Sequence, residues 1–170
     1  MDPQSPVYQV NYGRLMFSLG HDDDALAVWQ KLIKTDPDFT LTHSFLWQCF
    51  HRKGMFEQAF AEARMAHVAR GDNEAATSLA RGYAEGGYQR AMHVTAEMMA
   101  ARFTRRWVHP TAVAHLYAYA GEKDRALDWL ERAYQERDSL LIYLRFPEWE
   151  SVRAESRFGA LLRRMKLPTN

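Results

Sequence analysis

The sequence predicts an all-α solenoid, in which four antiparallel helix pairs follow one another and a C-terminal capping helix closes the series. Two observations support this prediction. A segment of the form Gly-x-x-x-x-Ala recurs along the 170 residues and brings an alanine every 32 to 35 positions, at Ala25, Ala59, Ala91 and Ala126. Around these segments the apolar residues recur at spacings of three and four, which is the period of an amphipathic helix, and no alternating strand pattern competes.

Composition and charge set the class of protein. With 47% hydrophobic and 25% charged residues, the chain reads as globular, and 170 residues fit one continuous domain, 1–170. The net charge of +1 gives no reason to expect nucleic acid or an anionic membrane as a partner. The single Cys49 cannot form an internal disulfide, and the N-terminus has neither the basic nor the apolar region of a signal peptide. We therefore expect a cytoplasmic protein.

The first helix pair is expected over residues 6–38. Its first helix is indicated by apolar residues at Tyr12, Leu15, Met16 and Leu19, and its second by Ala25, Val28, Trp29 and Leu32. Gly20 lies between the two stretches, where a reversing chain favours a residue that accepts positive φ. Pro37 closes the pair, because the residue before a proline disfavours helical geometry.

The second and third pairs are expected over residues 39–72 and 73–106. Leu46, Trp47 and Phe50 indicate the first helix of the second pair, and Gly54 its turn. Asp72 is placed to cap the following helix. Gly86-Gly87 marks the turn of the third pair, and we interpret it as a hairpin turn because no lysine follows as in a phosphate-binding loop.

The fourth pair is expected over residues 107–138 and the cap over 139–170. Pro110 suits the first turn of a helix, and Gly121 marks the turn of this pair. In the cap, we expect an apolar stripe to pack on the last pair and basic residues to occupy the remaining face. The stripe comprises Phe146, Trp149, Phe158, Leu161, Leu162 and Met165, and the basic face Arg153, Arg157, Arg163, Arg164 and Lys166.

The spacing of Gly20, Ala25, Trp29 and Pro37 resembles the tetratricopeptide repeat. Four such repeats cover residues 6–138; the second carries Gly71 where proline is usual, and the third is about one residue short near its turn. The resemblance implies a right-handed superhelical solenoid whose first helices line a concave groove.

The tail extends this resemblance. Glu136-Arg137-Asp138, Trp149-x-x-Val152-Arg153 and Arg157-Phe158-x-x-Leu161-Leu162 are similar to the end of tetratricopeptide segments in larger bacterial signalling and transcription-regulatory proteins. Ala154-Glu155-Ser156 departs from the Asp-Pro often found there. The similarity implies a bacterial interaction or sensor module.

No catalytic or metal-binding motif is found in the sequence, so we expect no enzyme activity and no cofactor. Asp22-Asp23-Asp24 is interpreted as the acidic first turn of a helix rather than a metal site. The seven histidines include no i, i+4 pair on a helix. Cys49 is interpreted as a packed, inert thiol, and the tryptophans and neighbouring aromatic residues as core.

The expected function is non-catalytic binding of a protein or peptide in the concave groove. Registration with the turn glycines predicts ten groove residues: Asn11, Arg14, Gln48, His51, Arg52, Ser78, Arg81, Glu85, His115 and Tyr119. Residues 41–107 carry nine basic and six acidic side chains, so the middle of the groove favours an acidic peptide.

The alternative function is oligomerisation, or regulation within a larger bacterial signalling or transcription-regulatory protein. The N-terminal end has only Val7, Tyr8 and Val10 with which to cover its apolar face. Self-association is therefore expected through the N-terminal face, with no direct contact to nucleic acid or membrane.

Overall fold

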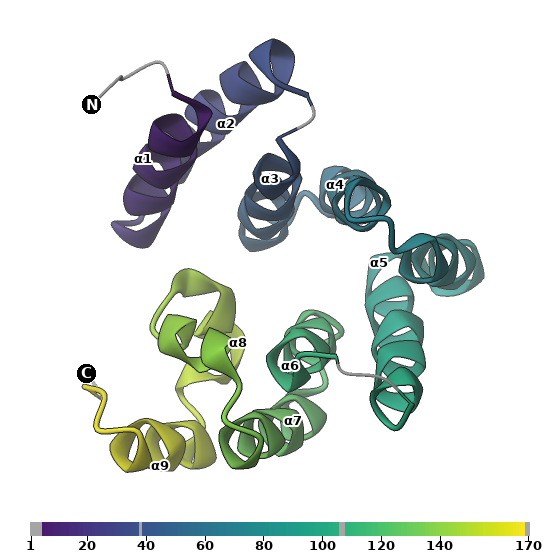
Figure 1. Ribbon diagram of the computed structural model, residues 1–170, viewed down its shortest axis with the longest axis vertical. Helices are drawn as coiled ribbons and strands as arrows, with labels where there is room; N and C mark the ends of the chain where they lie inside the picture. Colours follow the sequence, from purple (N-terminus) through teal and green to yellow (C-terminus); the bar gives the residue numbers. More distant parts are fainter. Residues whose placement is uncertain (1–4, 38, 106–107, 169–170) are drawn as a thin grey trace. The chain divides into compact units, whose positions relative to one another are not determined.

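The computed structural model describes residues 5–37, 39–105 and 108–168, and these residues form helices, turns and loops with no strand among them. The predicted all-α class is confirmed. The elements are α1 (Pro6–Ser18), α2 (Asp22–Thr35), α3 (Thr40–Arg52), α4 (Phe56–Ala69), α5 (Asn73–Phe103), α6 (Pro110–Tyr119), α7 (Lys123–Gln135), the 3₁₀ turns η1 (Ser139–Tyr143) and η2 (Pro147–Trp149), α8 (Glu150–Arg153) and α9 (Ser156–Arg164) (Figure 1). The predicted repeat boundaries at residues 38 and 106–107 lie outside the described residues.

The helices pack in sequence as pairs. α1 packs on α2, α3 on α4 and α6 on α7. The remaining pair is contained in α5, whose backbone leaves helical geometry at Gly86 and Gly87, so that α5 consists of two helices joined by a tight turn. The predicted hairpin turn at Gly86-Gly87 is thus confirmed.

The chain divides into two compact units, Met1–Ala80 and Arg81–Asn170. The first contains α1 to α4 and the start of α5, and the second contains the rest of α5 and all later elements. The single continuous domain therefore stays a prediction.

The repeated glycines and alanines have the predicted roles. Gly20 and Gly121 both adopt φ of +83°, the left-handed conformation in which the chain leaves one helix and reverses into the next. The four alanines that follow the turns are 0% exposed. Their small side chains therefore lie where the two helices of a pair approach closely.

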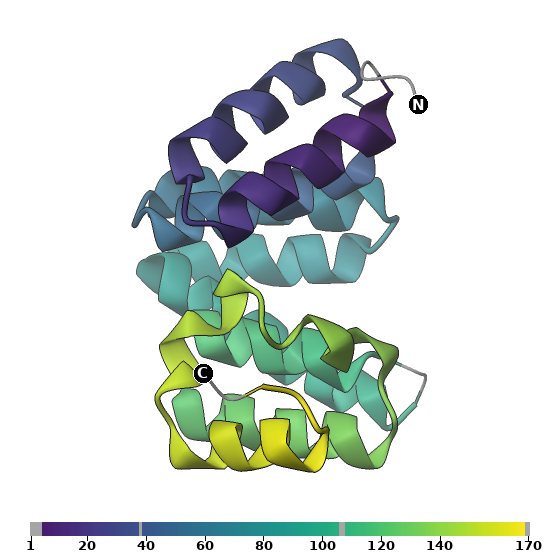
Figure 2. The same ribbon diagram turned by 90° about the vertical axis from the view of Figure 1, so that its left-hand side faces the viewer.

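The first unit is built around Trp29. Its ring is fully buried, stacks on Phe45 of α3 at a centroid distance of 5.4 Å, and contacts Phe17 of α1 at 5.8 Å. Trp29 Nε1 donates a hydrogen bond to the Val10 carbonyl at 3.2 Å, so the buried indole is satisfied. A Cβ atom at Gly13 would lie 2.7 Å from Trp29 Cε2, and this glycine is therefore required for α1 to approach α2. Figure 2 shows α1 and α2 side by side.

The buried face of α1 differs from the apolar stripe that the sequence indicated. The helix packs on α2 with Val10, Gly13 and Phe17, whereas Tyr12, Leu15 and Leu19 are exposed. Of the residues expected to cover the N-terminal end, Val10 is buried, but Val7 and Tyr8 are themselves exposed. The small Gly13 and the ring of Phe17 fit against Trp29, so packing at this tight helix crossing selects that face.

Helix ends follow the predicted signals. α2 ends at Thr35, two residues before Pro37, and α6 begins at Pro110. The Asp72 carboxylate accepts a hydrogen bond from the Ala75 N–H at 3.2 Å, which is the predicted N-cap of α5.

The cap of the second unit consists of several short elements instead of one helix. η1, η2, α8 and α9 follow α7, and both α8 and α9 pack on α7. Trp149, Phe158, Leu161 and Leu162 are buried, while the five predicted basic residues are exposed. The predicted covering of the last helix pair is confirmed, with Trp149 supplied by a 3₁₀ turn rather than by the final helix.

A buried carboxylate ties the cap to α6. The Asp138 side chain is fully buried and accepts hydrogen bonds from the Thr111 N–H at 3.0 Å, the Thr111 hydroxyl at 2.7 Å and the Leu140 N–H at 3.1 Å. His109 Nδ1 lies 2.8 Å from Oδ1 of the Asp138 carboxylate. Burial raises the pKa of this carboxyl, but the hydrogen bonds from Thr111, Leu140 and His109 outweigh burial and leave the pKa below its ordinary value.

Candidate binding surface

Three predicted groove residues lie on the neighbouring helices α1 and α3. Asn11 is exposed, and Arg14 and Gln48 are half-buried. The Arg14 guanidinium carbon lies 5.7 Å from the centre of the Phe45 ring, so Arg14 reaches from α1 to α3. Phe45 is itself half-buried and precedes Gln48 by one helical turn. We call Arg14, Phe45 and Gln48 the α1/α3 surface.

Phe45 belongs to this surface although the sequence reasoning did not single it out. Its ring stacks on Trp29 of α2 and lies beside the Arg14 guanidinium of α1. The signal was present in the spacing, because Phe45 lies three residues before Gln48 on the same helix. It was missed because aromatic residues at helical spacing were assigned to the core as a class.

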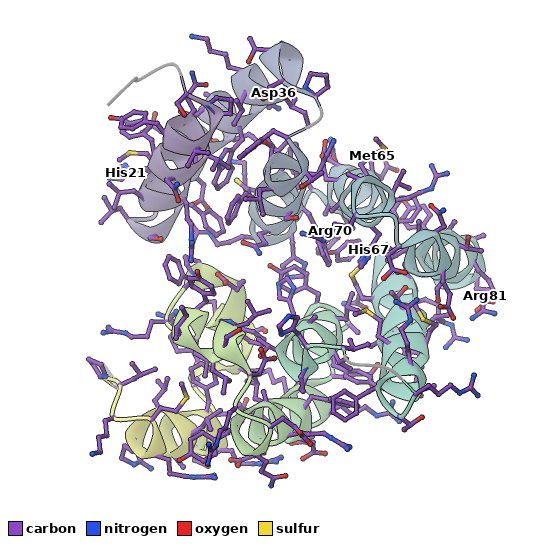
Figure 3. The ribbon with its side chains drawn as sticks, viewed as in Figure 1. His21, Asp36, Met65, His67, Arg70 and Arg81 are labelled. Atoms are coloured by element: carbon purple, nitrogen blue, oxygen red, sulfur yellow. The ribbon has the colours of Figure 1, made fainter. Side chains whose placement is uncertain are left out.

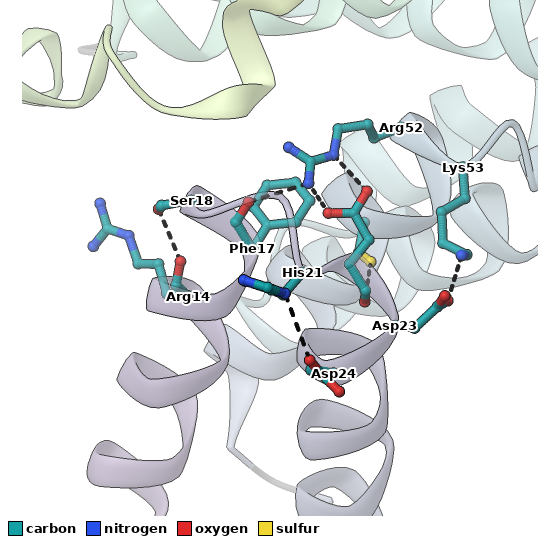
Figure 4. A network of polar contacts seen from close by, with 10 residues as sticks. Arg14, Phe17, Ser18, His21, Asp23, Asp24, Arg52 and Lys53 are labelled. Carbon is teal, nitrogen blue, oxygen red and sulfur yellow. Dashed lines mark hydrogen bonds and ion pairs between the residues drawn. The ribbon is translucent and has the colours of Figure 1, made fainter.

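Arg52 has an internal role in the first unit. Its Nε donates to Asp22 Oδ2 at 2.7 Å, its Nη2 pairs with the other Asp22 oxygen, and Nη2 also donates to the Phe17 carbonyl at 3.1 Å (Figure 4). The guanidinium carbon lies 4.1 Å from the centre of the Phe17 ring. These contacts join α3 to the first turn of α2 and the last turn of α1, so the Arg52 guanidinium is engaged within the first unit.

His51 lies half-buried on α3, with its ring 6.0 Å from that of Phe56. Burial lowers its pKa to about 4. The imidazole is therefore neutral near pH 7 and brings no positive charge to the predicted groove.

Ser78, at the start of α5 in the first unit, is buried. In the second unit Arg81 and Glu85 are exposed, and Figure 3 shows Arg81 on the first half of α5. Glu85 pairs with Arg90 at 3.1 Å and lies 3.9 Å from Arg81. Glu85 thus offsets part of the positive charge of two arginines on this helix pair, and exposed pairs of this kind contribute little to stability.

His115 and Tyr119 are packed together within the second unit. Tyr119 is buried, and the His115 ring lies 4.1 Å from the Tyr119 ring and 5.7 Å from that of Trp149. Their aromatic contacts connect α6 to the cap. Of the ten predicted residues, the structure thus places Arg14 and Gln48 on the α1/α3 surface and leaves Asn11 exposed on α1, and it gives Arg52, Ser78 and Tyr119 places in the packing.

The acidic first turn of α2 and the buried thiol lie as the sequence predicted. Asp22, Asp23 and Asp24 form the first turn of α2, where Asp22 pairs with Arg52 and Asp23 with Lys53. Cys49 is buried, and burial raises the pKa of its thiol to about 11, so the thiolate needed for reactivity is scarce near neutral pH. Among the described residues, no group of three or more His, Cys, Asp or Glu side chains could hold a metal ion.

A polar network in the second unit was not predicted from the sequence. Glu97 of α5 accepts a hydrogen bond from the Tyr117 hydroxyl at 3.0 Å and pairs with Arg125 of α7. Burial and the neighbouring Glu97 carboxylate raise the pKa of Tyr117 to about 12. His93 Nδ1 lies within hydrogen-bonding distance of Glu122, which in turn lies 3.4 Å from Arg125. The network joins α5, α6 and α7, and we interpret it as part of the packing of these helices.

Of the helices in the described part of the chain, none has the length and apolar character that a membrane span requires. Comparisons with models of protein families, with curated proteins and with solved structures gave no match to this chain.

Proposed function

We propose that this chain is a non-catalytic protein-protein interaction module, a right-handed solenoid of four tetratricopeptide-like helix pairs that binds a peptide of acidic character along its first helices. Support comes from the 34-residue step between Gly20 and Gly54 and from the contact between α1 and α3, the first helices of successive pairs. In a stacked array, such helices form a continuous binding face.

The observation that carries this proposal is the composition of the α1/α3 surface. It combines a cation, an aromatic ring and a carboxamide, all half-buried, from two successive first helices. The guanidinium suits a carboxylate in a forked geometry, and the Gln48 carboxamide can both donate to and accept from a peptide backbone. Phe45 offers apolar area for an aliphatic portion of the same peptide.

Selection from a displayed library of random peptides tests this function. The wild-type chain should enrich acidic sequences, and the affinity of a selected peptide should fall about tenfold or more in R14E, because the substitution places like charges together. R163E is the matched control, since Arg163 is an exposed arginine of α9 and its reversal should leave binding unchanged. Equal affinity in the wild-type chain and R14E would remove the α1/α3 surface as the binding site.

A second candidate function is oligomerisation or regulation within a larger signalling protein. The observation that favours it is the exposed apolar face of α1.

A further inference from the structure

One face of α1 carries a row of large apolar side chains exposed to solvent. Tyr8, Tyr12, Leu15 and Leu19 are 42%, 45%, 53% and 61% exposed. Their spacings of four, three and four place them on one side of the helix, away from the Val10, Gly13 and Phe17 face that packs on α2. We call these four residues the α1 stripe.

The repeat register identifies the α1 stripe as a packing surface. Thirty-four residues later, at the step set by Gly20 and Gly54, α3 carries Thr42, Leu46 and Cys49 where α1 carries Tyr8, Tyr12 and Leu15. Those α3 residues are fully or almost fully buried, and α3 packs on α2, with Cys49 Sγ 3.6 Å from the Asp22 carbonyl. Three of the four stripe positions are therefore covered by a helix in the second pair and exposed in the first, while Lys53, at the position of Leu19, is exposed in both.

We propose that the α1 stripe is a self-association surface, on which α1 of a second copy of this chain packs antiparallel about a two-fold axis. The spacings four, three and four read the same in both directions. Antiparallel pairing therefore sets Tyr8 of one copy against Leu19 of the other, and Tyr12 against Leu15. A two-fold interface requires this self-complementarity, and the alternation of three and four is that of a coiled-coil seam.

The residues beside the α1 stripe are uncharged, which suits pairing with a second copy of the chain. The flanking positions hold Gln9, Asn11, Met16 and Ser18, none of them charged, so two copies meet without like-charge repulsion. Asn11 Nδ2 donates to the Val7 carbonyl and Ser18 Oγ to the Arg14 carbonyl, each at 2.8 Å. These two donors keep a partner within their own helix when a second copy covers them.

The two tyrosines of the α1 stripe stack on each other within the helix. The rings of Tyr8 and Tyr12 stack nearly parallel, with an interplanar angle of 5° and centroids 6.4 Å apart. Two rings held by each other lose less side-chain freedom on binding than two independent side chains.

The size of the patch sets the strength of the dimer. The α1 stripe comprises four side chains, with Val7 exposed beside them, compared with about 20–30 residues a side in a standard interface. The dimer is therefore a reversible one in exchange with monomer. It uses a side of α1 different from that of Arg14, so it stands independently of peptide binding.

Sedimentation equilibrium of the full chain, over a concentration series from low micromolar upward, tests the self-association. The wild-type chain should show a monomer–dimer equilibrium, and L15E should weaken it about tenfold or more, because two charges are placed at the apolar seam. L41E is the matched control: Leu41 is another exposed leucine of the same unit, on α3, and its substitution should leave the equilibrium unchanged. A monomer at every concentration, or a dimer that L15E does not weaken, would overturn the proposal.

Cross-linking tests the antiparallel arrangement. A mixture of Y12C and L15C should form an intermolecular disulfide faster than either variant alone, since Tyr12 of one copy faces Leu15 of the other. The native Cys49 is buried and adds little background. Faster cross-linking of each variant with itself would indicate a parallel pairing and overturn the proposed geometry.

Discussion

Apolar helix faces are buried near the C-terminal end of the chain and exposed near its N-terminal end. At the C-terminal end, residues 139–167 cover α6 and α7, and Trp149, Phe158 and Leu161 are buried within the second unit. At the N-terminal end, α1 exposes Tyr12, Leu15 and Leu19. In a repeat array an element contacts mainly its neighbours, so an apolar face is buried where a neighbouring element packs on it. Substitutions on the buried face of the cap should therefore cost stability, whereas substitutions on the exposed face of α1 should cost little.

The largest effect is expected at Trp149 in the cap. Trp149 is 1% exposed, so W149A removes a large buried ring and should cost about 3–5 kcal/mol of unfolding free energy. For a chain of this length, each kcal/mol shifts Tm by about 2–4 °C, which thermal unfolding followed by circular dichroism resolves. I142A is the control in the same segment, because Ile142 is 66% exposed and its truncation should change stability by less than about 0.5 kcal/mol. Similar losses in both variants would contradict the cap packing.

A pH-dependent effect is expected at Asp138, which anchors the cap. Its pKa is lower in the folded chain than in the unfolded one, so its contribution to stability is present above the ordinary carboxyl pKa of about 4 and is lost as the pH falls through the folded value. D138N places an amide near the Thr111 and Leu140 donors and should cost about 1–3 kcal/mol at pH 7. Urea unfolding at pH 7 and near pH 3 should show a smaller difference between variant and wild type at the lower pH. A difference independent of pH would contradict the role of the carboxylate.

A smaller effect is expected on the buried face of α1, where Gly13 packs on Trp29. G13A brings a methyl group into contact with Trp29 and should destabilise by about 1–2 kcal/mol, since overpacking outweighs the gain in helix propensity. G159A in α9 meets only Arg163 Nη1 at 3.5 Å, an ordinary contact, and should stabilise by up to about 1 kcal/mol. Unfolding in urea measures both. A stabilising G13A would show that α1 does not approach α2 as closely as the structure has it.

The sequence was sufficient to predict the turns, the tight helix crossings and the helix starts. It was not sufficient to predict which apolar helix faces are covered. The turn glycines, the fully buried alanines and the helix starts at Asp22 and Pro110 were predictable because each depends on local geometry or on a tight crossing that repeats. The exposure of Leu15 was not, because helical period identifies an apolar side without showing whether anything covers it.

The candidate surface was predictable only in part for a similar reason. Arg14 and Gln48 follow from register, but the internal role of Arg52 depends on Asp22, thirty residues away, and on the Phe17 ring. The packing of Tyr119 depends on contacts made after folding, including its ring contact with His115. Charge counting along the chain cannot separate a cation that closes an internal pair from one that faces a ligand.

The contrast between the buried face of the cap and the exposed face of α1 is tested most directly by truncating one leucine in each. L161A removes a side chain that is 1% exposed and should lower the unfolding free energy by about 2–5 kcal/mol, whereas L15A, at 53% exposure, should lower it by less than about 1 kcal/mol in dilute solution where the chain is monomeric. Urea unfolding of the two variants beside the wild type gives both values. Equal losses at the two positions would contradict the account.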